Sequence, residues 1–260
     1  MMEILFIQFK YSLTKKKNFK FFLGVLFILF IYLMKLKYYF YQYDLKGSLV
    51  DYVIFSMGGW ENPILLTFLL DWIFFVFLVL CICIIISNEF EQLNIFILNR
   101  IGSKSKLWFY ICINQVVISF VVTLFVFVVT LGIGICFLGF DINTSEYTKF
   151  FYNSLNDINF FMLLIYVFLT FFTGICALQI LIKALSCIFY NEHIFYIFFL
   201  LVCVFTSFLF IYFKLPKVLS PIFLCSIIES NFISMYKNLV VNVIVIFIFF
   251  LIGTITCQKK

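Results

Sequence analysis

The chain has 260 residues, of which 65% are hydrophobic, 23% aromatic and only 12% charged, and its mean hydropathy is +1.18. Soluble domains average about 45–50% apolar and roughly 25% charged residues, so this composition excludes an ordinary soluble domain and predicts an all-α, polytopic membrane protein. The net charge of +6 does not indicate a nucleic-acid partner, because no basic helix interleaved with stacking aromatic residues lies outside the apolar runs. Excess lysine in a membrane protein sets its orientation and contacts anionic lipid of the bilayer.

Residues 2–14 predict an amphipathic helix that lies in the membrane interface and ends at a run of three lysines. Its apolar positions share one helical face: Met2, Leu5, Phe9 and Leu13. The alternative is the charged region of a signal peptide. We disfavour it because no small-residue cleavage site follows the next apolar run, which extends from Phe21 to Met34.

Six apolar runs then predict six transmembrane helices in one domain, residues 1–260, since no Pro-, Ser- or Gly-rich linker divides the chain. The predicted spans are about 18–36, 63–87, 107–140, 160–182, 194–213 and 239–257. With the N-terminus inside, the segment between the first two spans, which contains Asp51, is an outer loop.

Lysine and arginine counts favour this orientation, because cytoplasmic segments are enriched in both residues. Eleven fall on the inner side: Lys10, Lys15, Lys16, Lys17, Lys20, Arg100, Lys104, Lys106, Lys183, Lys259 and Lys260. Seven fall on the outer side: Lys35, Lys37, Lys46, Lys149, Lys214, Lys217 and Lys237. Both termini are therefore expected in the cytoplasm.

The stretch from Asn88 to Trp108, "NEFEQLNIFILNRIGSKSKLW", is the largest predicted inner segment. Asn88 is a possible helix N-cap with Glu91 three residues later, Gly102 can end a helix, and Ser103 can cap the next one. The pattern thus predicts a short helix of about 13 residues, a break, and a long helix. A solvated connecting loop is the alternative.

This stretch resembles the corresponding region of type-2 ABC exporter permeases, through Glu89, Glu91, Arg100, Gly102, Ser103, Lys104 and Trp108. The N-terminal helix, the six spans and the segment 214–230, which resembles a hairpin dipping into the outer membrane face, fit the same family. The resemblance is closest to permeases of bacteriocin or antimicrobial-peptide export and immunity. This loop departs from many relatives in having a single arginine.

The resemblance implies a bacterial plasma-membrane permease subunit that exports an amphipathic substrate, works as a dimer with itself or a similar permease, and does no chemistry. Its short cytoplasmic helix would be a coupling helix docked on a separate ABC ATP-binding subunit, which would bind ATP and Mg. The implied interface consists of Glu89, Glu91, Gln92, Asn99, Arg100, Gly102, Ser103 and Lys104.

The sequence has no phosphate-binding loop, no nucleophile elbow and a single histidine, His193, so neither nucleotide binding by that loop nor a zinc protease site is predicted. Most of the nine cysteines fall in apolar spans and are expected to behave as small hydrophobic residues. Cys225 is expected in an outer loop without a partner.

Polar residues within spans are costly in hydrocarbon, so each one is a candidate for function. Asp71 either lines a substrate path and pairs with a lysine such as Lys214, or lies at the outer interface. Four amides are expected to join helices by hydrogen bonds, with a substrate path as the alternative: Asn114, Gln115, Gln179 and Asn242. Two other functions stay open, an ion-coupled carrier that uses Asp71 and a stand-alone membrane immunity protein.

Overall fold

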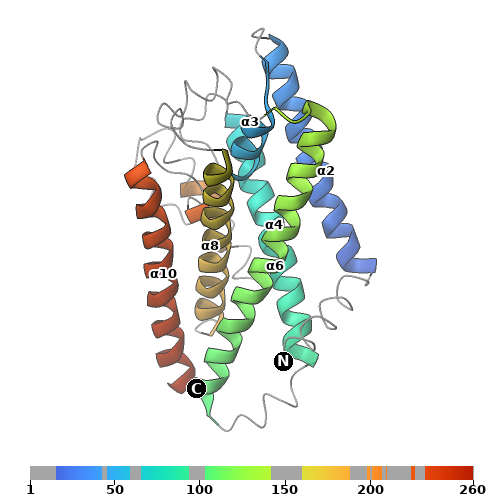
Figure 1. Ribbon diagram of the computed structural model, residues 1–260. Helices are drawn as coiled ribbons and strands as arrows, with labels where there is room; N and C mark the ends of the chain where they lie inside the picture. Colours follow the sequence, from blue (N-terminus) through green and yellow to red (C-terminus); the bar gives the residue numbers. More distant parts are fainter. Residues whose placement is uncertain are drawn as a thin grey trace.

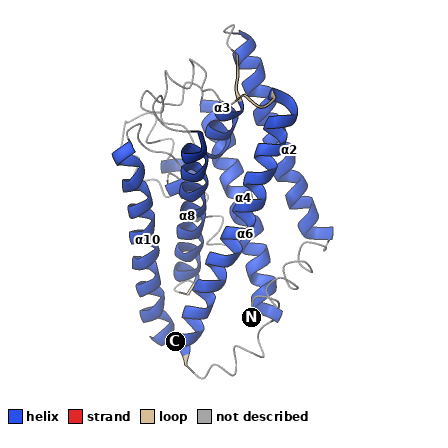
Figure 2. Ribbon diagram, in the orientation of Figure 1, coloured by secondary structure: helices blue, strands red, loops and turns tan. Residues whose placement is uncertain are grey.

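The structure is a computed structural model and describes residues 16–42, 46–58, 66–93, 103–141, 160–187, 198–199, 201–206, 209, 224–225 and 232–259. This part of the chain is helical and contains no strand (Figure 2). Five of its helices are long and apolar enough to cross a membrane. They are α2 (Lys16–Gln42), α4 (Leu66–Leu93), α6 (Lys104–Leu138), α8 (Phe160–Ser186) and α10 (Phe232–Lys259). The chain is therefore all-α and has the helices of a multi-pass membrane protein.

Five of the six predicted spans coincide with these helices, each of which is longer than, or displaced slightly from, its predicted span. The remaining span, predicted over 194–213, lies partly outside the described residues. Those that are described within it, 198–199, 201–206 and 209, are helical. The predicted interfacial helix over 2–14 lies wholly outside the described part of the chain.

In Figure 1, α2 and α6 run upward, whereas α4, α8 and α10 run downward. The bottom of Figure 1 carries the start of α6 and the ends of α4, α8 and α10, and the lower end of α2 is its start, which lies higher up on the right. The start of α2 and the end of α10 thus lie at the same end, which we call the α4–α6 end.

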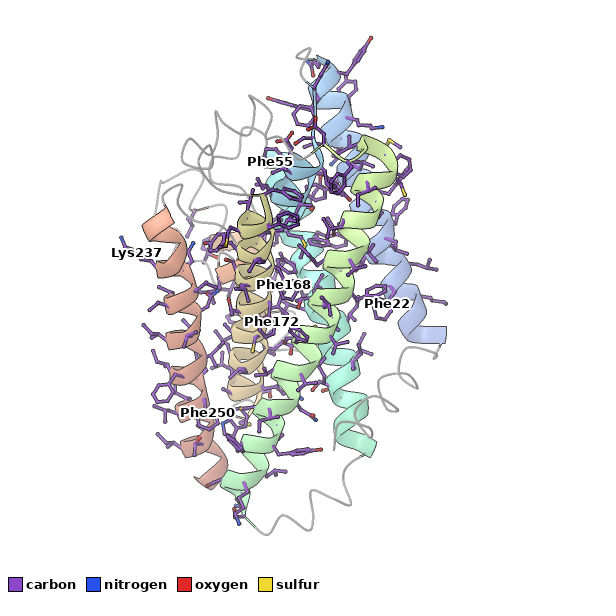
Figure 3. All side chains as sticks on the ribbon, in the orientation of Figure 1. Phe22, Phe55, Phe168, Phe172, Lys237 and Phe250 are labelled. Atoms are coloured by element: carbon purple, nitrogen blue, oxygen red, sulfur yellow. The ribbon has the colours of Figure 1, made fainter. Side chains whose placement is uncertain are left out.

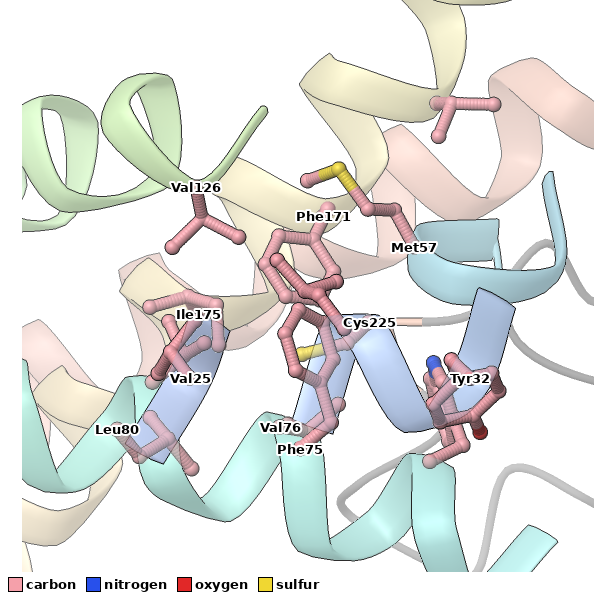
Figure 4. Packing of buried hydrophobic residues seen from close by; sticks show 14 of the residues in the cluster. Val25, Tyr32, Met57, Phe75, Val76, Leu80, Val126, Phe171, Ile175 and Cys225 are labelled. Atoms are coloured by element: carbon pink, nitrogen blue, oxygen red, sulfur yellow. The ribbon is translucent and has the colours of Figure 1, made fainter. Parts of the chain in front are cut away.

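The core is built from apolar side chains of α2, α4, α6 and α8 (Figure 4). At its centre Phe75 of α4 stacks on Phe171 of α8, with ring centroids 5.9 Å apart, and Met57 and Cys225 lie beside them. Aromatic rings also join α6 to α8 through Phe168 and Phe172, which Figure 3 labels. α10 buries the smallest share of its surface among the five long helices, and its outward side chains are mostly apolar, as expected for a helix that faces lipid.

Residues 48–58 are not an outer loop as predicted. They form the short helix α3 (Leu49–Val53) and a π-helical turn, η1 (Ile54–Gly58), and every one of them is buried. The backbone N–H of Ser48 donates to the Asp51 carboxylate at 2.7 Å, while the Ser48 hydroxyl accepts from the Asp51 N–H at 3.2 Å. This capping box supplies partners for polar groups at the start of α3, which have no water available inside the bundle.

Two further contacts fix this segment against the long helices. The Tyr52 hydroxyl donates to the Leu29 carbonyl of α2 at 3.0 Å. On the other side Gly134 of α6 lies so close that a Cβ atom there would be 2.9 Å from Cδ1 of Tyr52. The segment is therefore a buried part of the helical core.

Candidate functional site

The end of α4 carries the first part of the charged stretch. The predicted helix start at Asn88 is wrong, because α4 continues through Asn88, Glu89, Glu91 and Gln92 to Leu93. Asn88 is consequently not an N-cap. Its side-chain oxygen instead accepts a hydrogen bond of 3.0 Å from Nζ of Lys183 in the last turn of α8.

Lys183 is 6% exposed, so its ammonium group is held close to the end of the bundle rather than extended into solvent. A cation near a helix C-terminus interacts favourably with the exposed carbonyl groups there. The hydrogen bond to Asn88 adds a partner for a charge that is otherwise costly to bury. Together these contacts tie the last turn of α8 to the extension of α4.

The start of α6 is as predicted. Ser103 is its N-cap, and the Ser103 hydroxyl accepts from the Lys106 N–H at 3.3 Å. Lys104 and Lys106 are exposed beside it. Of the other predicted interface residues, Asn99, Arg100 and Gly102 lie outside the described residues, as do the side chains of Glu89, Glu91 and Gln92.

Trp108 joins the first turns of α6 to the rest of the bundle. Its side chain is 1% exposed, and its indole N–H donates to the Phe250 carbonyl of α10 at 2.9 Å. A small separate core surrounds it: Cys112, Cys176, Ile180 and Ala184. Gly253 of α10 lies directly against the indole ring, which needs the space that a side chain would occupy. Displacing the start of α6 would therefore also displace α8 and α10.

Three of the four predicted span amides make hydrogen bonds between helices. Gln115 of α6 donates to Ser87 of α4, and Gln179 of α8 accepts from Ser119 of α6 at 2.9 Å. Asn242 of α10 donates to the Thr173 hydroxyl at 2.9 Å and to the Leu224 carbonyl at 3.0 Å. The fourth, Asn114, is buried on α6. These contacts fit the expectation that such amides join helices.

Within the described part of the chain, the buried side-chain nitrogen of Gln179 has no hydrogen-bond partner. It belongs to the same polar layer as Ser87, Gln115 and Ser119, which links α4, α6 and α8. This spare donor leaves the layer able to donate one more hydrogen bond if the helices shift.

Asp71 lies far from these amides, in a groove between α2 and α4 that none of them lines. It forms an ion pair with Lys35 of α2. The predicted partner Lys214 lies outside the described residues. Asp71 precedes Glu89, the next charged residue of α4, by 18 positions, which is about 27 Å of helix and close to the ~30 Å thickness of bilayer hydrocarbon. The spacing favours Asp71 at one membrane boundary and Glu89 at the other.

Cys225 is not in an exposed loop as predicted. It is fully buried, and its backbone packs on Gly174 of α8, where a Cβ atom would lie 2.7 Å from the Cα of Cys225. None of the eight cysteines whose side chains the structure describes forms a disulfide. In that same part of the chain no three His, Cys, Asp or Glu side chains come together as metal ligands, and His193 lies outside it.

No protein-family model matches the sequence, and neither a curated protein nor a solved structure matches the chain.

Proposed function

We propose that the chain is the membrane-spanning subunit of an ATP-driven exporter, a permease that moves an amphipathic substrate out of a bacterial cell. The observation that carries the proposal is the construction of the α4–α6 end. There α4 continues as one unbroken helix through Asn88 and Glu89 to Leu93, and α6 begins at a capped turn with exposed lysines. The segment between them, residues 94–102, contains Arg100 and would dock on a separate ATP-binding subunit.

The contacts at this end give the proposed docking a mechanical consequence. An unbroken helix transmits an axial push better than a jointed one, so movement of the docked segment would reach the bundle through α4 and α6. Asn88 would carry it to α8 through Lys183, and Trp108 would carry it to α10 through Phe250. ATP and Mg would be bound by the partner, and this chain would bind neither.

The ion-coupled carrier is the weaker proposal for a physical reason. A coupling carboxylate must gain and lose its proton or ion during transport, within reach of both sides. Asp71 is already paired with Lys35 and lies near one boundary by its spacing from Glu89. If Asp71→Asn abolished transport while loss of the ATPase had no effect, the carrier would replace the exporter.

The test is affinity purification of the protein with a C-terminal tag in mild detergent, followed by mass spectrometry. We expect a stoichiometric ATPase that contains a phosphate-binding loop. The charge reversals Arg100→Glu and Lys104→Glu should release it, whereas Lys46→Glu, an exposed lysine at the opposite end of the bundle, should not. Absence of any ATPase from the folded wild-type protein would refute the proposal and favour the immunity protein.

A further inference from the structure

A groove of about 420 Å³ runs along the outside of the bundle between α2 and α4. Its lining is almost wholly apolar, and the Asp71 carboxylate is the one charged group in it: Gly24, Phe27, Ile28, Ile31, Tyr32, Asp71, Phe74 and Leu78. Phe27 and Phe74 are more than half exposed at its rim. The groove therefore opens sideways, toward the place that lipid would occupy, and its size falls within the range of about 300–1,000 Å³ found for ligand pockets.

The length of the groove matches one leaflet of a bilayer. At one end Gly24 faces Leu78, and at the other Asp71 pairs with Lys35. Gly24 and Lys35 are 11 residues apart on α2, which corresponds to about 16 Å, close to half of the ~30 Å hydrocarbon thickness. An acyl chain lying in the groove would end near the bilayer centre when its head group is level with the ion pair.

The charges at the outer end restrict the head group. Lys35 and Asp71 present one cation and one anion together, so a head group with only negative charge would be attracted by one and repelled by the other. A head group with a phosphate and a primary ammonium complements both, because the ammonium can donate hydrogen bonds to the carboxylate and the phosphate can accept from the lysine. A quaternary ammonium has no hydrogen to donate.

We propose that this groove binds one phospholipid with a phosphoethanolamine head group, its acyl chain along α2 and α4 and its head group on the Lys35–Asp71 pair. This inference goes beyond the proposed function and does not depend on it. In the orientation proposed above the lipid belongs to the outer leaflet.

The test is photo-crosslinking of the full chain in vesicles of phosphatidylethanolamine and phosphatidylcholine, with a diazirine in the acyl chain of a trace of one or the other lipid. Labelled residues are mapped by mass spectrometry. Phe27 and Phe74, which are 64% and 53% exposed, have matched controls on other lipid-facing helices in Phe247 at 61% and Phe109 at 54%. We expect the ethanolamine probe to label the groove pair several-fold more than the control pair, and the choline probe to label both pairs equally.

Two substitutions test the head-group contacts separately. Lys35→Gln should lower the excess labelling about tenfold, the effect of losing one charged hydrogen bond. Asp71→Asn leaves Lys35 as an unopposed cation and should shift the preference toward an anionic phosphatidylglycerol probe in vesicles that contain it. Labelling of Phe247 and Phe109 reports whether each variant is still inserted and folded.

Gly24→Leu fills the groove and should remove the excess labelling. Its control is Gly132→Leu on α6, where no atom lies within 4 Å of the added Cβ. Equal labelling of groove and control residues in the wild-type protein would show ordinary bulk lipid only and would overturn the proposal. A preference for the groove without head-group discrimination, or cross-links through the groove to a peptide or a second copy of the chain, would also overturn it.

Discussion

Replacing Gly253 with alanine would place a methyl carbon against the benzene half of the Trp108 indole, 2.7 Å from Cη2 and closer still to Cζ2. Neither partner can give way easily. The indole is 1% exposed and is held by its hydrogen bond to the Phe250 carbonyl, which belongs to the same helix as Gly253. Either α10 moves away from α6, or the ring turns and the bond breaks.

The expected cost follows from three terms. Overpacking a filled site costs about 1–3 kcal/mol, and loss of the indole hydrogen bond about 0.5–1.5 kcal/mol. Replacing a helical glycine by alanine returns about 0.8–1.0 kcal/mol of helix propensity. We therefore expect Gly253→Ala to lower the free energy of unfolding by about 0.5–3.7 kcal/mol.

Equilibrium unfolding in detergent or bicelles, compared with Gly132→Ala, measures this cost. The same change at Gly132 meets no atom within 4 Å and should be neutral or stabilising. Trp108→Phe removes the outer ring atoms, so a double-mutant cycle should show that most of the Gly253→Ala cost disappears in that background. If Gly253→Ala proved as stable as Gly132→Ala, the close approach of α10 to α6 would be refuted.

Tyr52→Phe should lower the free energy of unfolding by about 0.5–1.5 kcal/mol, because it removes the hydrogen bond to α2. The control Tyr38→Phe, at a position 70% exposed, should leave this free energy unchanged. Equal effects of the two substitutions would argue against a buried α3. Asn242→Ala should lower the unfolding temperature because the hydrogen bonds of α10 to Thr173 of α8 and to the Leu224 carbonyl are lost, at about 0.6 kcal/mol each by membrane-protein averages, and an unchanged transition would contradict that pairing. A membrane-impermeant maleimide added to intact cells should label Cys136, exposed near the end of α6, but not the buried Cys83; labelling of Cys136 from the cytoplasmic side alone would reverse the proposed orientation.

The positions of the long helices could be predicted because an apolar run of span length has few other structures available in lipid. Their ends were predicted less well, since a helix need not stop where its apolar run stops. The polar residues from Asn88 onward have helix-compatible side chains, and α4 simply continues through them to Leu93. An N-cap residue such as asparagine marks a helix start only when the preceding turn is not already helical.

The burial of residues 48–58 was not predicted, although this segment carries a local sequence signal. Ser48 and Asp51 have the spacing of a capping box, and an apolar run follows them. That motif predicts a helix start but not its depth in the bundle. Asp51 suggested a position in water, and the capping box instead satisfies its carboxylate within the core.

The ion pair and the buried lysine contact depend on which helices are neighbours. Lys35 and Asp71 are 36 residues apart in the chain, and Asn88 and Lys183 are 95 apart. The number of residues between two positions in the chain does not tell how close their side chains lie in space. Depth in the membrane could have favoured the Lys35–Asp71 pair. Lys35 lies near the end of its predicted span, and Asp71 lies near the start of the next, so both are expected near the same membrane face.

Apolar side chains gain little by choosing one another over lipid, so polar pairs and close glycine contacts must set which helices move together. Such ties join the four helices α4, α6, α8 and α10: Ser87–Gln115, Asn88–Lys183, Ser119–Gln179, Thr173–Asn242 and Trp108–Phe250. Between α2 and α4 there is instead an open groove, with the Lys35–Asp71 ion pair at one of its ends. If a partner acts on the α4–α6 end, the four joined helices should therefore move together, and the proposed lipid would lie where α4 meets α2.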